Sequence, residues 1–136
     1  MSKVSMTSRL PASAKEVWDL IGDFHNVPDW HPAVEKSVEE DGGEVRRLHL
    51  LGGGEIVERL VKRDDGSRTY SYTIVSAPLP VKNYKATIEV HEDKDGKATV
   101  EWASEFDPEG NESDAVKAIE GIYEAGFANL RKMLGG

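Results

Sequence analysis

Residues 97–134 read KATVEWASEFDPEGNESDAVKAIEGIYEAGFANLRKML and pass from one periodicity to another. Val100, Trp102 and Phe106 lie an even number of residues apart, which is typical of a strand with one buried face. Asn111 can cap a helix, and the apolar residues that follow it have helical spacing. The segment therefore predicts a final strand and then a long C-terminal helix. The apolar stripe of that helix consists of Ala115, Ala118, Ile119, Ile122, Tyr123, Phe127, Leu130, Met133 and Leu134.

The preceding part of the chain predicts one strand, a short helical region and five more strands. Ser13 and Glu16 have the spacing of a capping box, so we expect a helix over residues 14–22, after a strand at 3–9. Prolines after this helix permit at most a short second one. Glycine-bearing turns separate the later runs of period two. These runs cover residues 33–39, 44–51, 55–63, 68–76, 82–92 and 97–106.

This order of elements predicts an α+β protein. A strongly curved, seven-stranded antiparallel sheet would wrap around the long C-terminal helix, with two short helices after the first strand. Because one helix cannot fill the concave face of such a sheet, we expect an interior cavity beside it.

Composition narrows the classes of function. The chain has 136 residues, 17 Lys and Arg against 25 Asp and Glu, a net charge of −8 and no cysteine. The acidic balance argues against a nucleic-acid surface, and no apolar run approaches the roughly 18 residues of a membrane span. Without cysteine there is no disulfide or thiolate site. We expect one cytoplasmic domain over residues 1–136, a monomer or weak homodimer, with no cofactor, nucleic-acid partner or membrane partner.

Two charged residues are predicted to lie on the apolar inner face of the sheet. Strict alternation places Lys36 on the face of Val34, and Glu58 on the face of Ile56. An unpaired buried charge costs several kcal/mol. The two strands are not neighbours, so about 10 Å would separate the side chains, too far for a direct bridge. A ligand or a water chain would then lie between them; the alternative is that either side chain reaches solvent at a strand end.

Other polar residues give weaker signals. Tyr72 and Tyr84 lie on apolar faces of successive strands, where a ligand or the ordinary core could surround their hydroxyl groups. Arg46 and His49 are three residues apart, so only one of them can face inward, and the pattern leaves open which. The four histidines lack metal-ligand spacing, so no metal site is expected. Gly52-Gly53-Gly54 is best interpreted as a flexible turn, which could lie over the cavity mouth.

Four segments of the sequence resemble one known family. They are VWDLIGDFHNVPDWHPAVEKSV (17–38), IVERL (56–60), LPVKNY (79–84) and EWASEFDPEGN (101–111). They resemble the polyketide cyclase/dehydrase-like branch of the START superfamily, whose helix-grip fold is shared with the birch pollen allergens, and they are similar to plant abscisic acid receptors. The resemblance covers essentially the whole chain.

The resemblance implies a set of ligand-binding residues. In the receptors, the positions that match Lys36, Glu58, Tyr72, Ile74, Tyr84 and Glu101 line the hormone cavity, and the lysine holds a carboxylate. For Glu101 the alternation of its own strand predicts the opposite, outward orientation. The receptors' gate and latch sequences are replaced here by Leu50–Gly54 and Leu79–Val81, so the hormone switch is not implied. The expected ligand-binding residues are Lys36, Glu58, Tyr72, Ile74, Tyr84, Trp102, Tyr123 and Phe127.

Three functions compete at this stage. The first is binding of a small hydrophobic or amphipathic molecule, aromatic or carboxylate-bearing, with Lys36 meeting an anionic group. The second is a polyketide cyclase or dehydratase, in which Glu58 is the best candidate for a general acid or base. The third is an interaction module akin to chaperone activators, whose side chains would fill the cavity.

Overall fold

The computed structural model describes residues 1–135, and within them seven strands form one antiparallel sheet. The strand order is β1-β7-β6-β5-β4-β3-β2. The predicted sheet, short helical region and long C-terminal helix are confirmed. The elements are β1 (Ser2–Leu10), α1 (Ala14–Ile21), the 3-10 turn η1 (Val27–Asp29), β2 (Val34–Glu40), the 3-10 turn η2 (Asp41–Gly43), β3 (Val45–Leu50), β4 (Glu55–Asp64), β5 (Thr69–Ser76), β6 (Val81–Glu92), β7 (Ala98–Pro108) and α2 (Glu112–Met133).

Both α-helices begin at the residues that the sequence predicts as caps. The backbone N–H of Glu16 donates to Ser13 Oγ at 3.1 Å, and the Ser13 N–H donates to the Glu16 carboxylate at 3.4 Å. The backbone N–H of Asp114 donates to Asn111 Oδ1 at 3.1 Å. These bonds satisfy N–H groups that have no partner within the helix. Local sequence therefore fixes where each helix starts.

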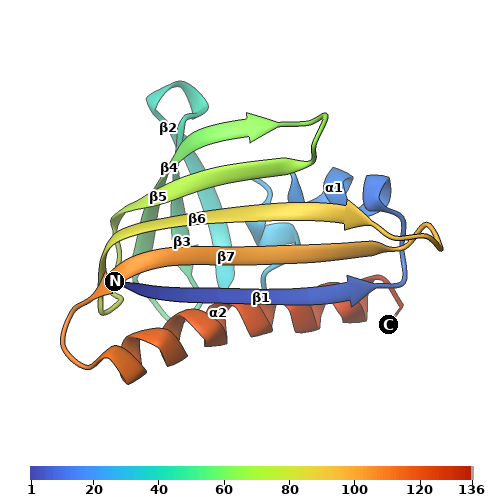
Figure 1. The fold of residues 1–136 in the computed structure, drawn as a ribbon. Coiled ribbons are helices and arrows are strands. Elements are labelled where there is room, and N and C mark those ends of the chain that lie inside the picture. Colours follow the sequence, from blue (N-terminus) through green and yellow to red (C-terminus); the bar gives the residue numbers. More distant parts are fainter. Residues whose placement is uncertain (136) are drawn as a thin grey trace.

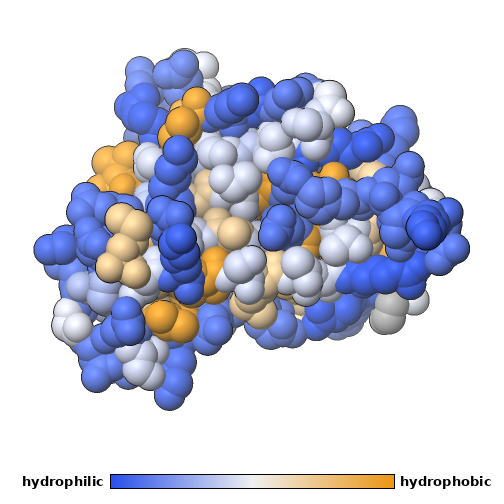
Figure 2. Space-filling model, in the orientation of Figure 1, coloured by the Kyte–Doolittle hydropathy of each residue, from blue (hydrophilic) through white to orange (hydrophobic). Residues whose placement is uncertain are grey.

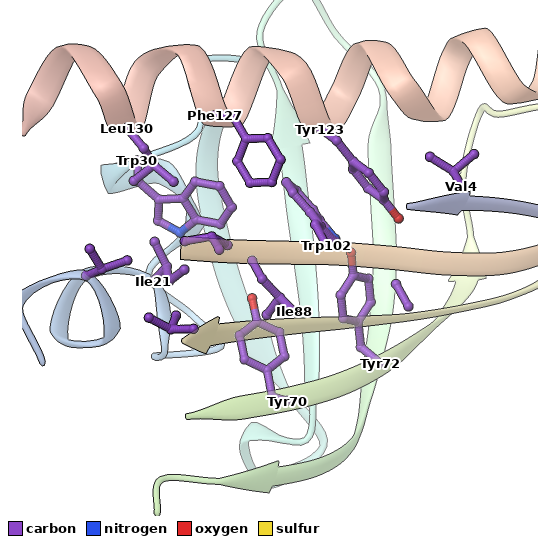
Figure 3. Packing of buried hydrophobic residues seen from close by; sticks show 14 of the residues in the cluster. Val4, Ile21, Trp30, Tyr70, Tyr72, Ile88, Trp102, Tyr123, Phe127 and Leu130 are labelled. Carbon is purple, nitrogen blue, oxygen red and sulfur yellow. Dashed lines mark hydrogen bonds between the residues drawn. The ribbon is translucent and has the colours of Figure 1, made fainter. Parts of the chain in front are cut away.

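The curved sheet grips α2, which runs along β1 and β7 (Figure 1). Tyr123 and Phe127 point from α2 toward Trp102 of β7 (Figure 3). The rings of Trp102 and Tyr123 stack, with centroids 4.1 Å apart. Gly126 lets α2 approach its neighbours closely, since a Cβ at this position would lie 3.0 Å from ring atoms of both Trp30 and His31. The helix α2 is therefore packed closely against β7 and the segment that follows η1.

The outer surface is mainly hydrophilic on the face drawn in Figure 2, and hydrophilic residues separate the apolar ones. Large apolar residues that are exposed in the described chain include Leu51, Val61 and Val75. Among the helices of residues 1–135, none has the length and apolar character that crossing a membrane requires.

Candidate functional site

An interior cavity of about 250 Å³ lies between the concave face of the sheet, α2 and the segment that follows η1. Its walls are mostly apolar and include Leu48 of β3, Ile56 of β4, Ile74 of β5, Trp102 of β7 and Ile119 of α2. Ligand cavities commonly measure about 300–1,000 Å³. The volume therefore suits a molecule of one or two rings better than a long lipid chain.

Arg46 of β3 and Glu58 of β4 form an ion pair on the cavity wall. They face each other in the β3–β4 ladder, and both side chains are almost fully buried. Arg46 Nε and Nη2 lie 2.8 and 2.7 Å from the same carboxylate oxygen, Glu58 Oε1. Arg46 Nη1 donates to the Phe24 carbonyl at 2.7 Å, and the guanidinium carbon lies 4.1 Å from the centre of the Phe24 ring. The cation is therefore surrounded by partners that belong to the protein.

Burial and pairing act against each other in this ion pair. Burial raises the pKa of Glu58 above its ordinary value, and the Arg46 guanidinium opposes that rise. Burial alone would lower the pKa of Arg46, but the Glu58 carboxylate and nearby tyrosines outweigh it and raise the pKa. Arg46 therefore stays cationic, and the carboxylate beside it is the cavity's internal counter-ion.

Two tyrosines supply uncharged polar groups to the cavity wall. The Tyr72 hydroxyl accepts a hydrogen bond from Trp102 Nε1 at 3.0 Å, and the Tyr84 hydroxyl bonds to the Tyr123 hydroxyl of α2. Burial raises the pKa of Tyr72 and of Tyr84 well above the ordinary value. Both side chains are therefore neutral phenols at physiological pH.

His31 also lines the cavity, but both of its ring nitrogens are occupied. Nε2 lies 2.8 Å from the Ile122 carbonyl, which can only accept, so Nε2 carries the proton. Nδ1 accepts the backbone N–H of Ala33 at 3.2 Å. Burial lowers the pKa of His31. The imidazole is held as one neutral tautomer that links the segment after η1 to α2.

This tautomer predicts a stability change with pH. Because the folded-state pKa is depressed, the unfolded chain binds the proton first as the pH falls below about 6.5, the ordinary histidine value. We expect the stability advantage of the wild type over a His31→Gln variant to be full above that pH and to narrow on acidification. Urea denaturation between pH 7.5 and 5.5 measures it, with His49→Gln, a half-buried position outside the cavity, as the control. A constant difference across the range would contradict the neutral assignment.

Two loops meet at the cavity mouth. Leu51 and Gly53 from the β3–β4 loop and Leu79 from the β5–β6 loop all line the cavity. A Cβ on Gly54 would lie 3.8 Å from the ring of Pro78, so the two loops are in near contact. Gly53 of the triple-glycine turn thus forms part of the cavity wall.

Comparisons with known proteins agree with this architecture. The family model described as polyketide cyclase/dehydrase and lipid transport matches residues 1–135. The chain belongs to the polyketide cyclase/dehydrase family. An abscisic acid receptor from Arabidopsis thaliana is 30% identical over 142 residues, which cover 94% of this chain and 73% of the receptor.

Solved structures of other proteins extend the comparison. The protein XoxI from Bacillus cereus is 37% identical with a TM-score of 0.95, over 98% of this chain and 96% of that one. A START superfamily protein from Mycobacterium smegmatis shares the fold at 13% identity, with a TM-score of 0.79 over 98% of this chain and 97% of that one. The predicted helix-grip fold and the predicted polyketide cyclase/dehydrase family are confirmed.

The predicted inward orientation of Lys36 is wrong. The β2–β3 register shifts between Val34 and Lys36, so that Lys36 faces His49 while the next residue, Ser37, faces the cavity-lining Leu48. This β-bulge inserts one residue and turns the rest of the strand over. Lys36 is exposed. The partner of Glu58 is therefore Arg46 on the adjacent strand, and no bridge across 10 Å is needed.

The other predicted site residues divide between the cavity and the core. Glu58, Tyr72, Ile74, Tyr84 and Trp102 line the cavity. By contrast, Tyr123 and Phe127 are not among the cavity-lining residues; both are buried in the core, where they pack against Trp102.

The two orientations that the sequence left open are now fixed. Arg46 faces inward and is 3% exposed, whereas His49 faces outward and lies 3.2 Å from Glu55. Glu101 also faces outward, beside His91, as its strand's alternation predicts and contrary to the resemblance. Sequence reasoning missed the role of Arg46; its place opposite Glu58 in a hairpin was the available signal.

In the part of the chain that the structure describes, one group of side chains has metal-ligand geometry. Donor atoms of Glu89, His91 and Glu101 all lie within 4.8 Å of one another on the outer face of the sheet. Spacing along the sequence could not reveal this group because it spans β6 and β7. Nε2 of His91 lies 2.9 Å from a Glu89 carboxylate oxygen and 3.7 Å from one of Glu101, so these polar contacts by themselves account for the grouping.

Proposed function

We propose that this member of the polyketide cyclase/dehydrase family is a single domain, over residues 1–136, that binds a small apolar molecule of aromatic character. The observation that carries the proposal is an interior cavity with mainly apolar and aromatic walls, in which the polar groups converge from different strands. The name of the Arabidopsis relative, an abscisic acid receptor, supports a small-molecule ligand.

Catalysis is the second candidate, and one observation favours it. Glu58 is a carboxyl group with a raised pKa on the wall of a cavity, as acid–base catalysts often are. Against it, Arg46 holds the carboxylate as an ion pair, and His31, the nearest conventional partner in acid–base work, has both nitrogens engaged. A Glu58→Gln variant that keeps full turnover of any identified substrate would remove this candidate.

An interaction module without a ligand has less support. That alternative predicts a cavity filled by side chains, whereas about 250 Å³ remains open. The exposed large apolar residues are scattered over different elements rather than forming one continuous docking face.

Native mass spectrometry of the freshly purified protein tests the proposal first. We expect an additional mass that is released on denaturation and that identifies the class of ligand. A bare mass, together with no thermal shift from a panel of small aromatic compounds, would contradict it.

A matched pair of neighbouring residues provides a sharper test. Ile74 lines the cavity, while Val75, the next residue of β5, is 60% exposed. Ile74→Trp places a large side chain in the ligand's volume, so we expect ligand affinity to fall by about tenfold or more. Val75→Trp adds the same atoms outside and should leave affinity unchanged. Isothermal titration calorimetry measures both, and equal affinities for the two variants would place the ligand elsewhere.

A further inference from the structure

We propose that the cavity selects an uncharged ligand carrying a hydroxyl or N–H group that donates to Glu58 Oε2, and that it discriminates against carboxylates. This inference rests on the proposed function and adds the chemical class of the ligand. It replaces the carboxylate expected from the sequence, which depended on an inward Lys36.

One cationic side chain of residues 1–135 lies on the cavity wall, and it is already paired. Arg46 is the cation on the cavity wall in the described chain, because Lys36 is exposed and His31 is a neutral tautomer. Each end of the Arg46 guanidinium is already engaged, with Nε and Nη2 on Glu58 Oε1 and Nη1 on the Phe24 carbonyl. Its Cζ atom lies over the Phe24 ring, 4.1 Å from the ring centre, and 4.9 Å from the centre of the Tyr72 ring. Because this cation already has a counter-ion, no free positive charge on the cavity wall of the described chain is available to a carboxylate ligand.

The two oxygens of the Glu58 carboxylate differ in their hydrogen bonds. Both guanidinium contacts go to Oε1, and within residues 1–135 no hydrogen bond is made to Oε2 of the same carboxylate. Oε2 is not among the fully enclosed atoms that lack a partner, and Glu58 lines the cavity, so we infer that Oε2 faces the open volume. A ligand O–H or N–H group meets an unused acceptor there. An anionic ligand meets a like charge instead.

The cavity also limits the size and shape of its ligand. Trp30, Tyr72, Tyr84 and Trp102 give the cavity an aromatic wall, and its volume of about 250 Å³ suits one or two rings. A fused bicyclic alcohol is therefore a fair probe of the class. Naphthol and naphthoate, substituted at the same ring position, match each other in size and differ in charge at neutral pH.

The experiment compares three probes on the full-length wild-type protein by calorimetry, with displacement of naphthol as a second readout. We expect naphthol to bind about tenfold or more tightly than naphthoate. The methyl ether of naphthol keeps the rings and the oxygen but cannot donate, and we expect it to bind about tenfold more weakly than naphthol.

Glu58→Gln tests whether this carboxylate causes the discrimination. The substitution removes the like charge and leaves Arg46 without its counter-ion, so we expect naphthoate to gain affinity and the preference for naphthol to be lost or reversed. Lys36→Gln, an exposed substitution of one charge, should keep the wild-type preference. Should Glu58→Gln not fold, the three-probe comparison on the wild type still decides the proposal.

The outcomes separate the two levels of the proposal. Equal binding of naphthol and naphthoate, or tighter binding of naphthoate, would overturn the selection for uncharged donors and leave small-molecule binding in place. Binding of none of the probes by a protein that also shows a bare mass in native mass spectrometry would overturn the proposed function itself.

Discussion

Replacing Arg46 by methionine is expected to lower the free energy of unfolding by about 3–5 kcal/mol, because it leaves the Glu58 carboxylate buried without its counter-ion. The loss should depend on pH. Without the guanidinium, the folded-state pKa of Glu58 rises further, so the folded variant holds a proton that the unfolded chain has released. The destabilisation is therefore smallest in acid and grows as the pH rises through the folded-state pKa. Urea denaturation at several pH values measures both effects.

Arg47 is the matched control, since it is the adjacent residue on the opposite face of β3. It forms ion pairs with Glu40 and Glu55 near the surface. Arg47→Met should cost only about 0–1 kcal/mol, because exposed ion pairs contribute little. The double variant Arg46→Met/Glu58→Leu should recover most of the lost stability, as apolar replacements of buried pairs often do. A single Arg46 variant no less stable than the Arg47 variant would show that the buried charge is not held by this pair.

Trp102→Ala is expected to cost about 3–5 kcal/mol in unfolding free energy, the usual range for deleting a large buried aromatic side chain. Trp102 stacks on Tyr123, packs edge-on against Phe127 and donates to the Tyr72 hydroxyl. It also belongs both to the aromatic core and to the cavity wall. The variant should therefore lose stability and at the same time acquire a larger internal volume. Denaturation followed by circular dichroism measures the first effect.

Trp102→Phe separates packing from hydrogen bonding at this position. It keeps an aromatic ring against Tyr123 and removes only the indole N–H and part of the volume, so we expect a clearly smaller loss of unfolding free energy than with alanine. If Trp102→Ala and Trp102→Phe lost the same unfolding free energy, stacking on Tyr123 would not be the source of the stability that Trp102 contributes.

The enlarged cavity of Trp102→Ala has its own test: a three-ring probe that the wild type excludes should bind to this variant.

Most of the fold could be predicted because local signals and the overall pattern agree. The capping residues Ser13 and Asn111 mark the helix starts, and the glycine-bearing turns separate strands of clear alternation. Each such signal depends on a few neighbouring residues. The polar wall of the cavity could be predicted only in part. Glu58, Tyr72 and Tyr84 lie on strands whose inner residues follow the alternation, and all three line the cavity.

Lys36 and Arg46 show why the remainder could not be predicted. The orientation of Lys36 depends on a bulge, which is a property of how two strands pair and leaves no mark in the alternation of one of them. For Arg46, both faces of β3 carry apolar residues, so alternation has no preferred phase. Only the position of Glu58 across the ladder identifies the inward face.

The bulge in β2 also has an evolutionary meaning. It decides whether Lys36 or Ser37 faces inward, and it does so through the pairing of one hairpin rather than through the identity of any residue. A one-residue change in the length of the turn at η2 could shift that pairing and exchange an outward lysine for an inward one. Ligand charge preference can therefore diverge between relatives by insertion or deletion in this hairpin, while the amino-acid sequence of β2 itself stays the same. Sequence identity at the cavity positions alone is then a poor guide to what two members of the family bind.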